Sequence, residues 1–210
     1  MIVGLDTSTP VTSVAVLGDD ELELHDEGDK PRHAQTLQPL LEEALERAGA
    51  SWEDVERLCV GVGPGGFTGL RLGIATARAI AQARDLPVVP VSSLDALAAG
   101  HEGRVAAVID ARRGEVFAAI YEDGARTLEP VALAPEALAA RLAPGTLAVG
   151  DGAVRFRVEL ERAGAAVPAD GSVAHRVSAL MVCRLGRARE PVVRDALLPD
   201  YRREPDAKPQ

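Results

Sequence analysis

Two short polar segments, each placed directly after an apolar run, are the first candidates for chemistry. Asp6-Thr7-Ser8-Thr9 follows the apolar residues 1–5, and Asp110 follows the apolar residues 105–109. In both places the chain returns through a second apolar run to a turn, which predicts a β-hairpin with a polar connection. Hydroxyls and backbone amides in such a connection can bind phosphate, so the candidate phosphate-contacting residues are Asp6, Thr7, Ser8 and Asp110. A polar turn without a ligand is the alternative interpretation.

A glycine-rich run from Gly61 to Gly73 carries the strongest local pattern. It follows an apolar strand and leads into a helix that we predict over residues 68–84. Its first glycines have the G-x-G-x-x-G spacing of dinucleotide-binding loops. Such a loop normally belongs to the first strand–helix unit of a fold, whereas here a hairpin and a helix come first. Pro64 also lacks the backbone donor that a pyrophosphate would need, so we do not predict a dinucleotide site.

The same run has two other interpretations. The glycines and the start of the helix could receive an anion, with Thr68 as the helix cap. Alternatively, the glycines allow a sharp turn and close packing of the helix against another element. Alanine occupies every second position of the helix from Ala75 to Ala83, which gives it low-relief sides and favours the packing interpretation. The packed element can belong to this chain or to a partner.

Neither a metal site nor a catalytic centre is indicated by the histidines, serines or acidic residues. His33 begins a predicted helix, but Leu37 occupies the position one turn later where a second metal ligand would stand. No G-x-S-x-G segment is present, and no serine, histidine and aspartate are marked as a triad. We predict no catalytic residue, no metal and no cofactor held by this chain alone.

The charge of the chain argues against independent binding to nucleic acid. The formal net charge is −9, and the only lysines are Lys30 and Lys208, whereas a protein that grips phosphates alone usually shows a basic face. A local patch at arginines 184, 187 and 189 stays open as an alternative. No secretory signal pattern and no apolar run of about 20 residues is present, so we expect a cytoplasmic protein that does not cross a membrane. Cys59 and Cys183 are expected to be reduced core residues.

The elements around these segments occur twice. A hairpin, an amphipathic helix, an apolar strand ending in glycine and a further helix can be followed from residue 1 and again from residue 105. The amphipathic helix is predicted over 33–49 in the first copy and over 135–142 in the second. We therefore predict an α/β fold of two related βα lobes, at residues 1–101 and 102–201, with a flexible tail at 202–210. The last helix is predicted over 174–189, with a buried face made of Val177, Leu180, Met181 and Leu185.

Taken in order, these pieces resemble the TsaB (YeaZ) family. The most specific are G-x-G-P-G-x-F-T-G-L-R-x-G at 61–73 and I-D-A-R-x-G-E-V-F at 109–117, and the resemblance runs over essentially the whole chain. It implies an actin-like, sugar-kinase-like (ASKHA) fold, in agreement with the duplication. It also implies a non-catalytic subunit of the complex that makes N6-threonylcarbamoyladenosine at position 37 of tRNA. The catalytic paralogue TsaD has a metal-binding pair of histidines on a helix, whereas the comparable helix here has His33 and Leu37.

The resemblance also implies partners and a partner surface. TsaD would form a heterodimer with this chain through helices of the first lobe, TsaE would join the pair, and the chain alone would form a homodimer. tRNA would be bound only within the complex. The residues implied at the partner surface are His33, Pro39, Glu42, Glu43, Gly63, Pro64, Gly65, Gly66, Phe67, Thr68, Arg71, Ala75 and Arg78.

An enzyme remains the competing hypothesis. It would be an ATP-dependent phosphotransferase, with Asp6 or Asp110 as the base, or a glycoprotein-endopeptidase-like hydrolase. Asp6-Thr7-Ser8 stands where an ATPase of this fold has Asp-x-Gly. The resemblance therefore implies that the phosphate-contacting residues are vestigial and that ATP or ADP binds, if at all, at the interface of the assembled complex.

Overall fold

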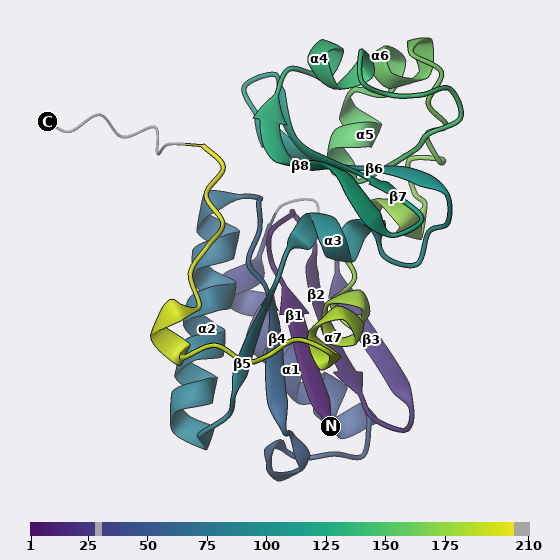
Figure 1. Ribbon diagram of the computed structural model, residues 1–210. Coiled ribbons are helices and arrows are strands. Elements are labelled where there is room, and N and C mark those ends of the chain that lie inside the picture. Colours follow the sequence, from purple (N-terminus) through teal and green to yellow (C-terminus); the bar gives the residue numbers. More distant parts are fainter. Residues whose placement is uncertain (28–30, 204–210) are drawn as a thin grey trace, which may run out of the picture.

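The computed structural model describes residues 1–27 and 31–203, and it forms two lobes, each built on one mixed β-sheet (Figure 1). The first part of the chain contains β1 (Ile2–Asp6), β2 (Thr12–Leu17), β3 (Glu21–Asp26), α1 (His33–Arg47), the 3-10 helix η1 (Trp52–Asp54), β4 (Arg57–Gly61), α2 (Phe67–Arg84), β5 (Val88–Val91) and α3 (Ser93–Ala98). The second part contains β6 (Arg104–Arg112), β7 (Glu115–Glu122), β8 (Ala125–Leu133), α4 (Pro135–Ala139), β9 (Leu147–Val149), α5 (Asp151–Arg155), α6 (Arg157–Arg162), η2 (Val173–His175), α7 (Ala179–Arg187) and η3 (Arg194–Ala196).

The two sheets repeat one topology. Their strand orders are β3-β2-β1-β4-β5 and β8-β7-β6-β9. β1 pairs antiparallel with β2 and parallel with β4, and β6 pairs in the same way with β7 and β9. The shared order and strand directions confirm the predicted duplication and the two-lobed, actin-like α/β fold.

The first sheet is covered by helices on both faces. On one face, α1 and α2 pack against apolar side chains of β1, β2 and β4, among them Val3, Leu5 and Val14. Leu37, Leu41 and Ala44 form the buried stripe of α1, at the predicted helical spacing. On the other face lies α7. Because both faces are covered, β1 and β2 are apolar nearly throughout and buried at every position.

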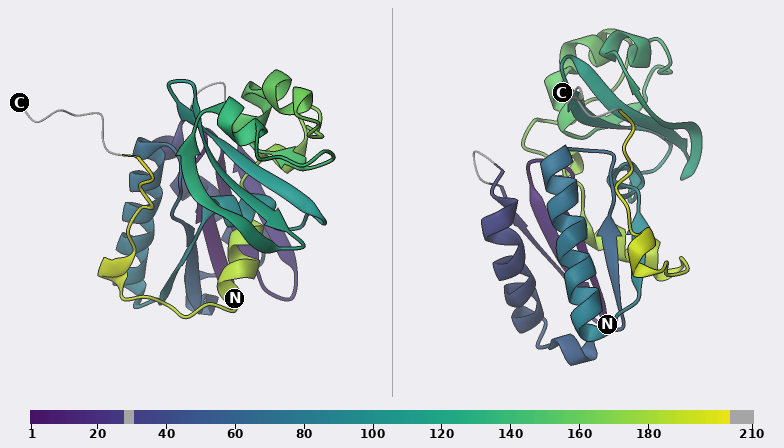
Figure 2. Two further views of the ribbon diagram at one scale, coloured as in Figure 1. Left: turned by 45° about the horizontal axis from the view of Figure 1, so that its top comes forward. Right: turned by 90° about the vertical axis from the view of Figure 1, so that its left-hand side faces the viewer.

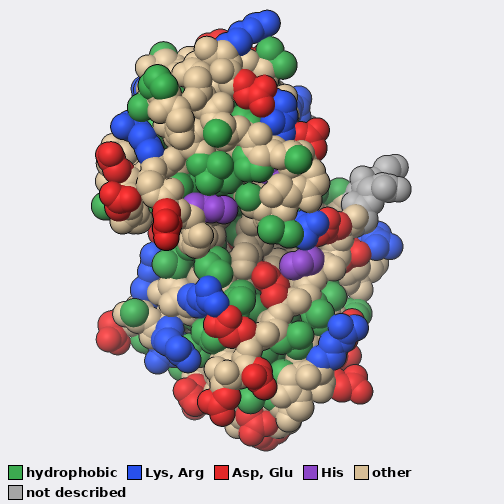
Figure 3. Space-filling view, turned by 90° about the vertical axis from the view of Figure 1, so that its right-hand side faces the viewer, with side chains coloured by type: hydrophobic (Ala, Val, Ile, Leu, Met, Phe, Trp, Pro, Cys, Tyr) green, Lys and Arg blue, Asp and Glu red, His purple; other side chains and the backbone are tan. Residues whose placement is uncertain are grey.

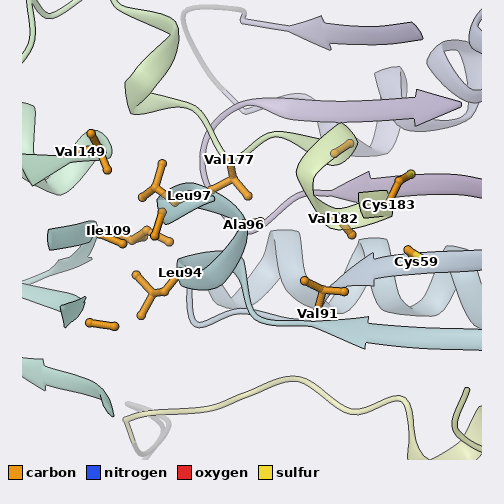
Figure 4. Close-up of a cluster of buried hydrophobic side chains, with 14 of the residues drawn as sticks. Cys59, Val91, Leu94, Ala96, Leu97, Ile109, Val149, Val177, Val182 and Cys183 are labelled. Carbon is orange, nitrogen blue, oxygen red and sulfur yellow. The ribbon is translucent and has the colours of Figure 1, made fainter. Parts of the chain in front are cut away.

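One hydrophobic core joins the two lobes. Leu94 and Leu97 of α3 lie between Val91 of the first sheet and Ile109 and Val149 of the second (Figure 4). The same cluster takes in side chains of α7. Because α3 packs on β6 and β7 of the second sheet and on α7, which lies on the first sheet, it connects the lobes and helps to fix their relative position.

The last helix returns to the first lobe, which corrects the predicted boundary at residue 201. α7 contacts β1, β2 and β4, and the segment 188–203, called the C-terminal strap below, continues along α2 (Figures 1 and 2). Val192 donates its backbone N–H to Val88 of β5 at 2.9 Å, and Asp200 donates to Val62 at 2.8 Å. The first lobe is therefore completed by residues after the second lobe.

Other differences from the predicted elements have local causes. The last helix begins at Ala179, not at residue 174, and its fully buried residues are Ala179, Val182, Cys183 and Gly186. Small side chains suit this face because α7 lies so close to the sheet that a Cβ on Gly186 would be 2.4 Å from the Cys59 sulfur. The further helix predicted after the glycine-ending strand of the second copy is divided into α5 and α6, and strands β3 and β8 were not predicted. Of the predicted tail, residues 204–210 lie outside the described residues, whereas Arg203 is described and pairs with Glu115 at 2.9 Å.

Candidate functional site

The hairpin end of the first lobe is closed around Asp6. Asp6 Oδ1 accepts hydrogen bonds from the Ser8 backbone N–H at 2.8 Å and from Ser8 Oγ at 2.7 Å. Asp6 Oδ2 accepts from Ser93 Oγ at 2.7 Å. The residue is 1% exposed, and burial raises its pKa above the usual 3.8, although these hydrogen bonds oppose the rise. Both carboxyl oxygens are therefore occupied by the protein itself.

The glycine-rich loop and the start of α2 form the cover of this hairpin end. A Cβ on Gly65 would lie 2.3 Å from the Ser8 carbonyl oxygen, and one on Gly69 would lie 2.0 Å from that of Thr7. Gly66 donates its N–H to the Ser8 carbonyl at 2.7 Å, and Thr7 Oγ1 donates to the Gly69 carbonyl at 2.8 Å. The glycines thus serve close packing within the chain, which is the interpretation that the alanine pattern favoured.

His33 is a buried polar residue of the same region. Its Nδ1 lies 2.8 Å from Thr12 Oγ1, and burial lowers the pKa of the imidazole, opposed by the nearby Asp6 and Asp26 carboxylates. In residues 1–27 and 31–203, no three His, Cys, Asp or Glu side chains come together as a metal site would need.

The hairpin end of the second lobe is charged. Asp110 forms ion pairs with Arg155 at 2.7 Å and with Arg112 at 3.2 Å. Its backbone N–H donates to Asp151 Oδ1 at 3.0 Å. Burial raises the pKa of Asp151, and the Asp110 carboxylate adds to the rise. Sequence reasoning missed Asp151, although Gly150-Asp151-Gly152 occupies the strand-to-helix turn that corresponds to the glycine-rich loop.

Both hairpin ends border one cleft of about 450 Å³ between the lobes. Its lining includes Thr9, His33 and Thr68 from the first lobe and Asp110, Arg112 and Asp151 from the second. α1 and α2 begin at this cleft without a side-chain cap. The N-cap of α2 is Gly66, so the prediction that Thr68 caps this helix is wrong. The duplication therefore brings Asp110 to the same cleft as the Thr7–Ser8 segment.

An aromatic–arginine stack stands on the outer side of α2. The Arg71 guanidinium lies 3.7 Å from the centre of the Phe67 ring, and Arg71 Nε donates to the Tyr201 hydroxyl at 2.8 Å. The Phe67 and Tyr201 rings stack with centroids 5.4 Å apart. Phe67 and Tyr201 remain 43% and 42% exposed. The strap thus brings Tyr201 beside Phe67 and Arg71, two of the residues that the family resemblance implied at the partner surface.

The side of the molecule away from α2 shows the waist between the lobes (Figure 3). At the lobe junction, the Asp95 carboxylate of α3 accepts from the Tyr121 hydroxyl at 2.8 Å and from Arg126 of β8. Arg189 of the strap also donates to Asp95, at 3.0 Å. The arginines and the tyrosine hydroxyl hold the pKa of Asp95 below its usual value although burial opposes this. This network links α3, the second sheet and the strap.

Known proteins of similar sequence and fold identify the family. The solved structure of YeaZ from Pseudomonas aeruginosa superposes with a TM-score of 0.78 at 31% identity and covers 95% of this chain and 98% of that chain. The chain belongs to the TsaB (YeaZ) family. A family model described as "TsaD: tRNA N6-adenosine threonylcarbamoyltransferase" also matches residues 27–169.

Two curated relatives show how the similarity is distributed. An uncharacterized protein of Mycobacterium tuberculosis is 36% identical over 215 residues, which cover 99% of this chain and 94% of the relative. The tRNA threonylcarbamoyladenosine biosynthesis protein TsaB of Escherichia coli is 39% identical over 126 residues, which cover 58% of this chain and 54% of that protein. The mycobacterial relative thus matches this TsaB-family chain along essentially its whole length, whereas the Escherichia coli protein matches little more than half of it.

The predicted partner-surface residues of this TsaB-family chain fall into three groups by exposure. His33, Gly63 and Pro64 are buried, so they do not present side chains to a partner. Gly65, Glu43 and Arg78 are half-buried, and the remaining members are exposed on α1, the glycine-rich loop and α2: Pro39, Glu42, Gly66, Phe67, Thr68, Arg71 and Ala75. Between α1 and α2 lies a groove of about 420 Å³ whose lining includes Leu41, Glu42 and Trp52.

Among residues 1–27 and 31–203, no helix has the length and apolar composition to cross a membrane.

Proposed function

We propose that this TsaB-family chain is a non-catalytic subunit in the biosynthesis of threonylcarbamoyladenosine in tRNA, and that it binds and activates a TsaD-family partner. The family membership supports the pathway, because relatives bear the name of biosynthesis proteins for this nucleoside. The observation that carries the non-catalytic role is the closure of the first hairpin end around Asp6.

A phosphate-binding or general-base carboxylate must reach its substrate. Asp6 is instead 1% exposed, and its two carboxyl oxygens are occupied by Ser8 and Ser93. The glycine-rich loop lies on the hairpin at backbone distance, so freeing Asp6 would require α2 to move. This arrangement supports a role of the first lobe in packing and recognition, with the chemistry performed by the partner.

The partner-binding surface in this proposal is the outer face of α1 and α2. Its groove exposes Ala83 and Glu42 next to the partly buried Trp52 and Ile80. Small side chains at the rim allow the backbone of a partner helix to approach closely, as in other helix-to-helix interfaces. A second copy of the chain would use the same face when the partner is missing.

The proposal also covers the other components of the complex, its nucleotide and its cellular location. TsaE joins the pair, tRNA is held only by the assembled complex, and ATP or ADP binds at the assembled interface without a cofactor in this chain alone. The complex works in the cytoplasm. The formal net charge of −9 supports the dependence on partners for tRNA binding, since phosphate contacts need arginine or lysine.

A phosphotransferase is the second candidate, because one observation favours it. Asp110 and Asp151 both border the cleft, and burial keeps the pKa of Asp151 raised, as a general base or acid would require. In that case Asp151→Asn would abolish ATP turnover by the isolated chain. In the subunit proposal the isolated chain has no turnover to lose, and Asp151→Asn still supports the partner.

The test of the subunit proposal is threonylcarbamoyl transfer to tRNA by the TsaD-family protein, TsaE, the adenylate-forming enzyme and ATP, with and without this chain. We expect product only when the chain is present, and none from the chain without its TsaD-family partner. Equal product without the folded chain would overturn the proposal.

A matched pair of variants locates the surface. Ala83 of α2 and Ala137 of α4 are both exposed helical alanines, but only Ala83 lines the α1–α2 groove. Ala83→Arg is expected to weaken partner binding by about tenfold or more, since a long charged side chain would fill the groove. Ala137→Arg should leave the dissociation constant within about twofold. Calorimetric titration of each variant with the partner measures both.

A further inference from the structure

The backbone crosses between the two lobes at two segments that lie side by side. Residues 99–103 lead from α3 to β6, and residues 176–178 lead from η2 to α7. Gly100 of the first crossing and Val177 of the second line one cavity of about 510 Å³, which places the two crossings next to each other. Gly100 has a φ of 86° and adds backbone freedom to its crossing. Two adjacent loop crossings of this kind form a hinge about which one lobe can rotate.

The end of the C-terminal strap, residues 200–203, makes a further connection between the lobes. Figure 2 shows the strap rising beside α2 and reaching the second lobe. The Asp200 backbone N–H donates to the Val62 carbonyl of the first lobe at 2.8 Å. Three residues later, Arg203 Nη1 donates to the Ala111 carbonyl at 3.1 Å and to Glu115 Oε2 at 2.9 Å, both in the second lobe. The strap end therefore bridges the lobes through side-chain contacts that can form and break.

The acceptor in the second lobe is a bulge at the end of β6. The register of β6 on β7 shifts between residues 110 and 112, which makes Ala111 the extra residue of a β-bulge. The extra residue of a bulge is left out of the ladder, so its carbonyl can accept from Arg203. Hydrogen bonds with a charged donor are stronger than neutral ones. The bulge thus provides a specific docking point for the strap end.

The strap end also touches both walls of the cleft between the lobes. In the first lobe, the Tyr201 ring stacks on Phe67 with centroids 5.4 Å apart, and Phe67 lines the cleft. In the second lobe, Arg203 holds Ala111, whose neighbours Asp110 and Arg112 line the cleft. The distance between the two walls is therefore coupled to the contacts of Arg203.

The strap end and the hinge lie on opposite faces of the first sheet. α7, which follows the second crossing, packs on one face, and α2, which the strap follows, packs on the other. The core around α3 holds the lobes together next to the hinge, because the first crossing begins at the end of this helix. A contact placed away from a hinge restricts rotation more effectively than a contact at the hinge. The Arg203 contacts are well placed to control rotation.

We infer that the strap end is a clasp that holds the cleft closed, and that release of Arg203 lets the second lobe rotate about residues 99–103 and 176–178 and widens the cleft. The contact is suited to reversible release, because the Arg203 and Glu115 side chains are 26% and 41% exposed. Ion pairs with this exposure are weak and are screened by salt. The inference concerns this chain alone and does not depend on the proposed function.

The experiment measures the distance between the lobes by double electron–electron resonance on the full chain. Spin labels are attached through Glu46→Cys of α1 and Ala137→Cys of α4, since both positions are exposed. The native Cys59 and Cys183 are 0% exposed and stay unlabelled. An excess of unlabelled chain restricts the signal to distances within one molecule.

Two neighbouring arginines provide the variant and its matched control. Arg203→Ala removes the clasp, whereas Arg202→Ala removes the same charge from a side chain that pairs within the strap, with Asp200 at 2.7 Å. We expect Arg203→Ala to shift the distances to longer values and to raise the population of the open form by about fivefold. Arg202→Ala should leave the distribution unchanged. High salt should move the unaltered chain towards the distribution of Arg203→Ala.

The opposite outcomes are equally clear. Superimposable distributions for the unaltered chain and Arg203→Ala would overturn the inference. An equal shift in Arg202→Ala would also overturn it, because the effect would then come from the charge of the strap and not from the bridge.

Glu115→Gln tests the same contact from the second lobe, and does so even if Arg203→Ala fails to fold. It should shift the distances in the same direction but by less, since the Ala111 carbonyl still accepts from Arg203. Arg203→Ala/Glu115→Gln should match Arg203→Ala alone, because both changes break one contact. A further shift in the double variant would show that the two side chains act independently and would contradict the clasp.

Discussion

The hairpin ends of the two lobes occupy the same place in a duplicated fold but are built from different chemistry. In the first lobe, the Asp6 carboxylate is bound by neutral donors of Ser8 and Ser93 and is 1% exposed. In the second lobe, the Asp110 carboxylate is bound by Arg112 and Arg155, whose side chains are 66% and 47% exposed. The Asp110 side chain is itself only 6% exposed, so both aspartates are buried, but Asp6 is covered by neutral donors and Asp110 by arginines that reach the solvent.

The difference shows how duplicated lobes can divide their tasks. Neutral hydroxyl donors need no hydration, so the first hairpin end can be covered by the glycine-rich loop at van der Waals distance. Guanidinium groups are costly to bury, so Arg112 and Arg155 stay exposed at the cleft while the Asp110 carboxylate lies beneath them. Both lobes keep the same backbone topology. Their side chains differ, so that the first hairpin end packs internally and the second presents polar side chains at the cleft.

Gly69→Ala, at the hairpin end of the first lobe, is expected to have the largest effect on stability among variants of the two hairpin ends. Alanine favours a helix over glycine by about 1 kcal/mol, but its Cβ would lie 2.0 Å from the Thr7 carbonyl oxygen. Because that atom belongs to the hairpin backbone, α2 must move away, and we expect a net loss of about 3 kcal/mol in the free energy of unfolding. Urea denaturation measures it. Gly171→Ala is the control, since nothing lies within 4 Å of its added Cβ. Equal urea midpoints for the two variants would show that α2 does not pack tightly on the hairpin of the first lobe.

Ser93→Ala tests the hydrogen bonds beneath the cover. The Ser93 hydroxyl donates to Asp6 Oδ2 at 2.7 Å and accepts from the Gly63 N–H at 3.1 Å. Its removal leaves two buried polar groups without a partner, so we expect a loss of about 2 kcal/mol in unfolding free energy. Ser172→Ala, at a partly exposed helix cap, should cost roughly half of this or less. Similar losses for both would mean that water replaces the hydroxyl at Asp6.

The features of the fold and the site that could be predicted are those whose sequence pattern lies within one short stretch of chain. The periodicity of Leu37, Leu41 and Ala44 identified α1, and the repeated hairpin patterns identified the duplication, because both signals lie in short stretches of chain. The packing role of the glycine-rich loop was also recognised, from the alanines of α2. Its target, the Thr7–Ser8 backbone, could not be read from the sequence because 62 residues separate Thr7 from Gly69.

The failures of prediction are long-range. Leu180, Met181 and Leu185 pack against the core as predicted but are only partly buried. The fully buried residues of α7 are the smaller Ala179, Val182, Cys183 and Gly186, because the helix lies close to the sheet. The return of this helix to the first lobe has no local signature. Of the candidate site, Asp6, Ser8 and Asp110 were found by position, whereas Ser93 and Asp151 were missed because their roles arise only when distant strands meet.

Asp6→Asn tests whether the stability contributed by the hairpin end of the first lobe depends on pH. Burial raises the folded-state pKa of Asp6 above its usual value of 3.8, so the folded protein holds this proton more tightly than the unfolded chain. The wild type therefore loses stability as pH rises from about 4 through the folded-state pKa. Asparagine has no such proton and can still donate to Ser93 Oγ. We expect the stability of Asp6→Asn relative to wild type to rise by roughly 1 kcal/mol across this range, in urea denaturation at several pH values. A difference that is flat with pH would contradict a buried, proton-holding Asp6.

Asp110→Asn should have the smallest effect, because the Asp110 ion pairs involve partly exposed arginines that water and salt can screen. Asparagine keeps an oxygen that can accept from the Arg112 backbone N–H, now 2.9 Å from Asp110 Oδ1. We expect a loss below about 1 kcal/mol in unfolding free energy at low salt, and a smaller one at high salt, since screening already weakens these pairs in the wild type. A loss above about 2 kcal/mol that is insensitive to salt would place Asp110 in a buried network like that of Asp6. The two hairpin ends would then be chemically different but equally sealed, and the division of tasks between the lobes would have to be sought in the cleft-facing Asp151 instead.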